Sequence, residues 1–580
     1  MILQALVNYY EQLEKQGKIA KPGWISVGVS FAVCISESGR LEQIISVKTE
    51  QQRGKKTVVA PQNMEVPVQN KHTRGVNANF LCHNSTYLLG IDKNGQPEHA
   101  IRCFTESAEL HKKLLINVDC EAARAILAFF SSWQPEQACE NPALAEVWDE
   151  LFNGGNLVFR VNGRYAHKDS AIQAAWQQYY HAKGDGNDMV CCITGKNGPI
   201  ARLHPEIKGI HGGHSAGNTI VSFNKPSFCS FGRDQGLNAP TSEYAAYAYT
   251  SALNHLLSNR NRVYKLGNTT VVCWAENAID AYQALFDCIL SDNSSNYSED
   301  EINGMTKSLL NGALIEFNEQ LIDPSQPFYI LGLSPNSARV SIRFFMRNTF
   351  GAFLKNIDDH QQRLKIIRPS WEKSNTLSLW RLLNETVNQK SRDRSPSPEL
   401  AGEMLSAVLN NTPYPATMLN AVTLRIRAES DITYGRAAAI KAYYLKKPNK
   451  DVPKEVLTVS LNKESTNIPY LLGRLFSVYE QIQQEANPGI NATIKDKYFN
   501  SASGNPAVIF PILGNLAQKH LRVIRRDRTG LAINLEKQIG EITNKIGDSF
   551  PARLNLPQQG SFQLGYYHQN AERYIKKEDK

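Results

Sequence analysis

The 580-residue sequence lacks the short motifs that mark several large classes of enzyme and metalloprotein. It contains no G-x-x-x-x-G-K-[ST] and no G-x-G-x-x-G, so the common signatures of nucleotide binding are missing. Its 10 cysteines include no C-x-x-C pair and end at Cys288, a scatter that is typical of idle thiols in a reducing compartment. We therefore expect no metal and no cofactor.

Long apolar runs are also missing, and none approaches the roughly 18 residues of a membrane span. The first residues, MILQALVNYYEQLEKQGKIAKPGW, have no basic segment followed by an apolar one. They predict an amphipathic helix that ends near Gly17, not a signal peptide. These absences predict a soluble, cytoplasmic protein that makes no contact with a membrane.

Basic residues are in excess, and the excess is concentrated in one region. Lys and Arg number 64 against 55 for Asp and Glu, a net charge of +9. Residues 401–580 contain 24 basic and 16 acidic residues, so 24 − 16 = +8 of this charge lies there. A localised basic excess favours a polyanionic partner over a merely solvated surface.

The hydrophobic pattern predicts an α+β protein. Strand-like runs such as WISVGVSFAVCIS and RLEQIISVKTE alternate with helical ones, and FYILGLSPNSARVSIRFFMR predicts a hairpin. After the Pro/Ser-rich stretch at 388–400, helical periodicity dominates. We expect an N-terminal α/β domain at 1–120, a central α/β domain with short sheets at 121–387, a linker or exposed loop at 388–400, and an all-α bundle at 401–580.

One short pattern suggests catalysis. Gly213-His214-Ser215-Ala216-Gly217 fits G-x-S-x-G, the turn between a strand and a helix that presents the nucleophile of α/β-hydrolases. Its surroundings do not fit, because the following NTIVSFNKP alternates like a strand and Pro226 blocks a helix. A serine hydrolase that uses Ser215 is therefore the alternative hypothesis, and no catalytic residue is our first expectation.

The same region offers other polar chemistry. The loop histidines around it lack a Cys pair or a carboxylate at ligand spacing, and His204-Pro205-Glu206 is not followed by the P-C-x-x-C of zinc deaminases. Lys208 and the neighbouring glycines could instead cradle a phosphate with successive backbone N–H groups. A tight turn between domains explains the glycines equally well.

Two further stretches suggest nucleic-acid contacts. In QNKHTRGVNANFLCHNSTYLLG, cations that can hold phosphates stand beside amides that can read base edges. In the C-terminal region, four arginines fall within seven positions, and three of them share a helical face. The candidate nucleic-acid-binding residues are Lys71, Thr73, Arg74, Asn77, Asn79, Asn84, Lys208, Arg522, Arg525 and Arg526.

Five separated stretches together resemble one known family. MILQALVNYYEQL, GVNANFLCHNSTYLLG, IKGIHGGHSAGNTIVSFNKPSF, GLNAPTSEYAAYAYTSALNHLL and FYILGLSPNSARVSIRFF are similar to the large subunit of the type I-C CRISPR surveillance complex, Cascade. The likeness runs in order from residue 1 to about 350. The family has a GGQSSG-like sequence where this chain has His214, which is a departure.

The resemblance implies a non-enzymatic subunit that recognises the protospacer-adjacent motif in duplex DNA, helps to open and hold the R-loop, and offers a docking surface for the helicase-nuclease. The implied partners are crRNA, target double-stranded DNA and its displaced strand, the backbone subunits, the crRNA-processing subunit and small subunits made from an internal start. A binding module outside CRISPR that stacks bases on the RVSIRFFMR hairpin is a third hypothesis.

Overall fold

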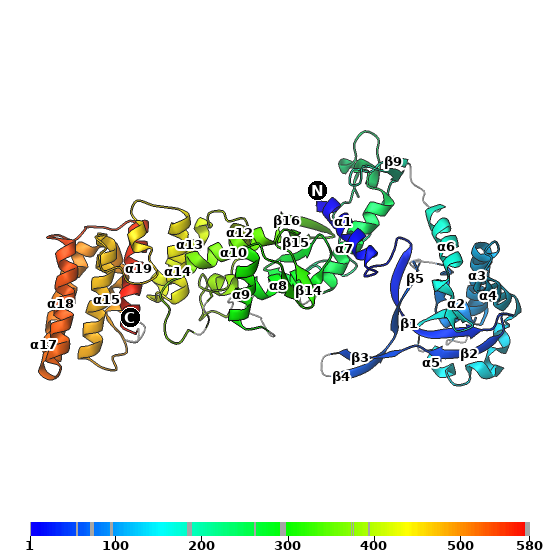
Figure 1. Cartoon of the computed structure of the whole chain (residues 1–580), viewed down its shortest axis with the longest axis horizontal. Helices are drawn as coiled ribbons and strands as arrows, with labels where there is room; N and C mark the ends of the chain where they lie inside the picture. The colour runs from blue at the N-terminus through cyan, green and yellow to red at the C-terminus, as the bar shows by residue number, and fades with distance from the viewer. Residues whose placement is uncertain are drawn as a thin grey trace. The chain divides into compact units, whose positions relative to one another are not determined.

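The computed structural model describes residues 2–53, 56–69, 75–92, 97–152, 154–182, 188–259, 263–290, 297–372, 374, 376–392 and 395–574. Within them the chain forms two compact units (Figure 1). Residues 1–206 and 221–255 make the first, and residues 207–220 and 256–580 make the second. The predicted α+β class is confirmed, since short sheets precede a long helical region. The predicted four-part division of the chain stays a prediction.

A six-stranded sheet forms the centre of the first unit. Strand β1 is long enough to serve three partners, pairing antiparallel with β2 and β5 and parallel with β7. Its second half is buried at consecutive residues, as expected for a strand covered on both faces. The elements of this unit are α1 (Ile2–Lys15), β1 (Trp24–Ile35), β2 (Leu41–Ser46), β3 (Thr49–Arg53), β4 (Lys56–Ala60), β5 (Gln62–Pro67), β6 (Cys82–His83), α2 (Ser85–Leu88), α3 (Pro97–Leu115), α4 (Glu121–Ser132), α5 (Trp148–Leu151), β7 (Asn156–Val161), β8 (Arg164–Tyr165), α6 (Ser170–Ala182), β9 (Asp188–Val190), β10 (Asn197–Pro199) and the start of α7 (Glu243–Ser258).

The second unit begins with an antiparallel sheet in the order β11-β12-β15-β16. The predicted hairpin is confirmed, because β15 and β16 pair along their length and turn at Ser337 and Ala338. Helices α8 and α10 pack against this sheet. The elements are β11 (Tyr264–Leu266), β12 (Thr269–Ala275), α8 (Asp280–Leu290), α9 (Glu299–Leu310), β13 (Ile315–Phe317), β14 (Gln320–Ile322), β15 (Pro327–Asn336), β16 (Arg339–Thr349), α10 (Phe350–Leu364), α11 (Leu379–Asn384), α12 (Pro398–Leu409), α13 (Ala416–Glu429), α14 (Tyr434–Lys446), α15 (Ile468–Ala486), α16 (Ile494–Gly504), α17 (Pro506–Asp527), α18 (Thr529–Ile546) and α19 (Leu556–Glu572).

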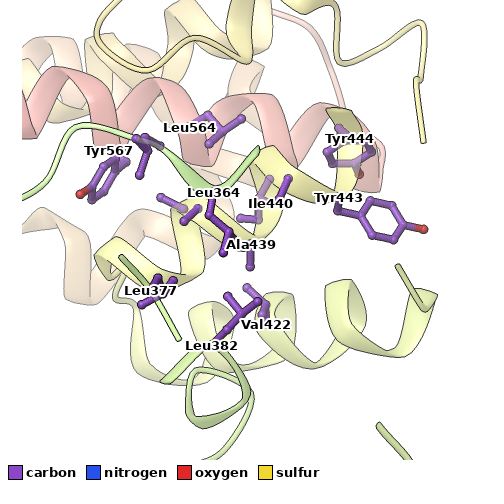
Figure 2. Packing of buried hydrophobic residues seen from close by; sticks show 14 of the residues in the cluster. Leu364, Leu377, Leu382, Val422, Ala439, Ile440, Tyr443, Tyr444, Leu564 and Tyr567 are labelled. Carbon is purple, nitrogen blue, oxygen red and sulfur yellow. The ribbon is translucent and has the colours of Figure 1, made fainter. Parts of the chain in front are cut away.

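One continuous apolar core links the helices of this unit from α8 to α19. Figure 2 shows part of it, where Val422 of α13, Ile440 of α14 and Leu564 of α19 face a shared interior. Helices α15 and α19 approach so closely that glycine is required at their crossing. A Cβ on Gly473 would lie 1.9 Å from the Phe562 carbonyl oxygen, a distance that no side chain tolerates.

One local expectation is wrong. The strand expected after Ser215 is reduced to isolated bridges at Asn218 and Thr219. There the Asn218 side chain hydrogen-bonds to the backbone of His214 and Ser337, a contact that a period-two pattern does not register.

Candidate nucleic-acid interface

The segment at residues 70–84, whose cations and amides predict nucleic-acid contacts, lies only partly within the described structure. Lys71, Thr73 and Arg74 lie outside the described residues. Asn77 is half-buried, and its backbone N–H donates to the Tyr87 hydroxyl at 3.3 Å. Asn79 is only 4% exposed. The side chain of Asn84 caps α2 by accepting from the Tyr87 N–H at 3.3 Å.

The backbone of this segment is fixed by aromatic and polar contacts. His83 stacks on Tyr87 with ring centroids 3.7 Å apart, and its Nδ1 accepts from the Asn84 N–H at 2.8 Å. Gln69, which precedes the segment, donates from its Nε2 to the Cys82 carbonyl at 3.4 Å. Asn77 and Asn84 are therefore both partly exposed, Asn79 is buried, and the Asn84 side chain is engaged in capping α2.

A buried histidine that the sequence pattern did not single out also contacts this segment. His111 of α3 accepts the Leu81 N–H through Nε2 at 2.9 Å. Its Nδ1 lies 2.7 Å from the Ser107 carbonyl, so Nδ1 carries the hydrogen. Burial lowers the pKa of His111 to about 4, which keeps the ring neutral. This bond satisfies a backbone group of Leu81, whose φ of 60° is rare for a side-chain-bearing residue.

The Gly-His-Ser-Ala-Gly turn is attached to the β15–β16 hairpin by Asn218. Asn218 Oδ1 accepts the His214 N–H at 3.0 Å, and Nδ2 donates to the Ser337 carbonyl at 2.8 Å. A Cβ on Gly213 would stand 2.5 Å from that Oδ1, which explains the glycine. Backbone bonds from Thr219 to Ala338 and from Val340 to Thr219 complete the attachment.

This geometry differs from that of a nucleophile elbow. Ser215 is exposed on a turn, and the chain continues into isolated bridges where an elbow needs a helix. Lys208 is exposed near the start of the same segment. His204 is buried with its Nδ1 2.7 Å from the Tyr249 hydroxyl, and burial lowers its pKa to about 4. Within the described ranges, no three His, Cys, Asp or Glu residues form a group that could hold a metal.

Helix α17 exposes all three of its predicted arginines, but they are not equivalent. Arg525 forms an ion pair with Glu536 of α18. Arg522 and Arg526 have no ion pair among the described residues. Lys519 precedes them by three and seven positions and is exposed too, so three cations lie in one row along the helix. The sequence analysis missed Lys519, although its i, i+3, i+7 spacing is readable from the sequence.

Comparison with known proteins identifies the family of this chain. The model of the family described as CRISPR-associated protein (Cas_Csd1) matches residues 6–574, so the chain belongs to this family. No curated protein matches it. Membership assigns it the role of a subunit of a Cascade complex, in which crRNA and other Cas proteins are its companions. Across the described residues, every helix is too short or too polar to cross a membrane.

Proposed function

We propose that this chain is the non-catalytic large subunit of a type I-C Cascade, which recognises the protospacer-adjacent motif in duplex DNA and helps to open and stabilise the R-loop. It also offers the docking surface for the helicase-nuclease. Its other partners are the backbone subunits, the crRNA-processing subunit and small subunits. The family match over residues 6–574 carries the proposal, because it covers both surfaces described above.

The segment 70–84 is the proposed motif reader. Asn77 presents a partly accessible amide on a fixed backbone, and an amide can form paired hydrogen bonds with a base edge. Lys71, Thr73 and Arg74 contact the flanking phosphates. Lys208, which belongs to the second unit, is a separate proposed phosphate contact. The buried Asn79 and the capping Asn84 hold the segment in shape.

The cation row of α17, defined as Lys519, Arg522 and Arg526, is the proposed track for the displaced strand. Phosphates need charge in a line and no particular side-chain orientation, which an exposed helical face supplies. Arg525 strengthens the field of the row while it stays paired with Glu536.

A motif-depletion assay tests this function. The reconstituted complex is challenged with a library of targets that carry a matching protospacer and randomised flanks. We expect targets that carry one short flank sequence to be depleted. Asn77→Ala should widen the set of flank sequences that are depleted. Ser215→Ala should leave depletion unchanged. Depletion that ignores the flank, or an esterase activity that disappears with Ser215→Ala, would overturn the proposal.

A further inference from the structure

The most exposed aromatic ring among the described residues is that of Phe231. Phe231 is 99% exposed, although a large apolar residue normally avoids water. It lies in the first unit on residues 225–238, which we call the aromatic loop. Phe231 has a φ of 56° and Gly232 a φ of 66°, so the backbone turns sharply at this ring. A left-handed conformation is costly for phenylalanine, and such positions cluster at functional sites.

The aromatic loop holds this conformation through the Asn238 side chain. Its Oδ1 accepts the Ser230 N–H at 2.9 Å, and its Nδ2 donates to the carbonyls of Arg233 and Gln235 at 2.9 and 3.0 Å. The three bonds close the loop on both sides of Phe231. The ring is therefore presented outward by a fixed backbone.

A second set of contacts joins the loop to residues 201 and 202 of the same chain. The Gly236 N–H donates to the Arg202 carbonyl at 3.1 Å, and Arg202 Nε donates to Gln235 Oε1 at 2.5 Å. A Cβ on Gly236 would lie 2.1 Å from the Ala201 carbonyl oxygen, so only glycine permits this approach. The loop base is thus locked.

The surroundings of the ring fit a nucleic acid better than a protein. Lys225 and Arg233 of the loop are exposed, Arg202 lies at its base, and Asp234 is the one acid in the loop. The chain neighbours of Phe231 are Ser230 and Gly232, and Phe228, which is 41% exposed, is a second exposed aromatic residue of the same loop. Exposed rings flanked by cations are the arrangement on which unpaired bases stack.

We propose that the aromatic loop binds a single-stranded nucleic acid, with Phe231 stacked on one unpaired base and with Lys225 and Arg233 on the adjacent phosphates. This site shares no residue with the motif-reading segment or with the cation row. It therefore goes beyond the proposed function, and it can fail or hold independently of either surface.

Binding of labelled oligonucleotides to the full-length chain tests the proposal. The protein carries Arg522→Gln and Arg526→Gln in every sample, so that the cation row contributes little. The probes are oligo-dT and oligo-rU of twelve nucleotides and an abasic DNA of the same length. We expect Phe231→Ala to weaken binding of dT or rU about tenfold and to leave the abasic strand unchanged, because only a base offers a face for stacking. Loss on dT, on rU or on both assigns DNA, RNA or either as the source.

Three variants separate stacking from other causes. Phe231→Trp should bind dT or rU as tightly as the native residue or more tightly, and Phe231→Leu should be as weak as Phe231→Ala, since only an aromatic ring stacks. Leu314→Ala, which removes another large side chain that is 57% exposed, should change nothing. Equal loss on the abasic strand would overturn the proposal. Unchanged affinity for every probe, with or without weaker assembly with other Cas proteins, would overturn it as well.

Discussion

The two surfaces proposed to contact target DNA are built in opposite ways. Around Asn77 the backbone is fixed by buried groups such as His83 and His111. On α17 the backbone is an ordinary helix, its cations are exposed, and Arg522 and Arg526 have no ion pair within the described part of the chain. Base readout requires exact placement, whereas phosphate contact requires only a line of charge. Substitutions in the two regions should therefore differ in kind as well as in size.

The largest effect should come from the scaffold beneath the cation row. Gly473→Ala would place a methyl group within 1.9 Å of the Phe562 carbonyl and force α15 and α19 apart. We expect the free energy of unfolding to fall by about 3 kcal/mol or more, which chemical denaturation of the second unit would measure.

Gly540→Ala is the matched control, since a Cβ there meets open space within α18. It should raise stability by up to about 1 kcal/mol, because alanine favours a helix more than glycine does. Equal destabilisation by the two substitutions would mean that the close crossing of α15 and α19 does not exist.

Acid should weaken the first unit next most strongly. Burial lowers the pKa of His111, His167 and His204 to about 4, against about 6.5 in an unfolded chain. Above pH 6.5 neither state binds these protons, so stability is unaffected. As pH falls from 6.5 towards 4, only the unfolded chain takes up protons. Each histidine then lowers the free energy of unfolding by up to about 1.4 kcal/mol per pH unit.

Urea unfolding at pH 7.5 and pH 5.5 checks this dependence. His167→Phe should reduce the difference between the two pH values, because His167 is 1% exposed and neither of its ring nitrogens has a hydrogen-bond partner among the described residues. Stability that is equal at the two pH values in the native protein would contradict the account.

Substitutions in the motif-reading segment should change the preference for the correct motif over other DNA. Asn77→Ala should weaken binding to the correct motif by about one to two decades, since a good base contact is worth about 1–3 kcal/mol. Binding to motif-less DNA should change much less, and thermal stability should stay the same. Asn79→Ala is the control within the segment: its buried side chain makes us expect a lower unfolding temperature. Gel-shift titration and thermal unfolding measure the two effects.

The cation row should give the smallest change in free energy. Arg522→Gln with Arg526→Gln should shorten R-loop lifetime several-fold and flatten the salt dependence of single-strand binding by about 0.7 per residue. Arg525→Gln should have a weaker effect, because that guanidinium is already paired with Glu536. Lifetimes measured at several salt concentrations test this, and an unchanged lifetime at moderate salt counts against the row.

Periodicity predicted the elements well but not the contacts between them. The β15–β16 hairpin and the C-terminal helices are readable from their apolar spacing. The burial of Asn79 and the capping of α2 by Asn84 are not, because a loop asparagine that reads a base and one that caps a helix look alike in sequence. The turn at Ser215 shows the same limit. Asn218, three residues beyond, joins it to a hairpin more than 100 residues further along the chain.

The candidate site was predictable only where helical geometry applies. Arg522 and Arg526 share a face by spacing alone, and so does Lys519. The partner of Arg525 lies on the next helix and could not be read from α17. His111 stands 30 residues from Leu81, and nothing in the local sequence links the two. Long-range polar contacts of this kind appear only once the fold is known.

One measurement tests the division of labour between the two surfaces most directly. Reconstituted complexes with native sequence, Asn77→Ala, Arg522→Gln plus Arg526→Gln, and all three changes are titrated with targets that carry a correct or a scrambled motif, across a range of salt. The account predicts that Asn77→Ala lowers the ratio of the two affinities without altering the salt slope. The arginine changes should lower the slope without altering the ratio, and the effects should add in the combined variant. Both sets of changes acting on the same quantity, whether ratio or slope, would contradict the account.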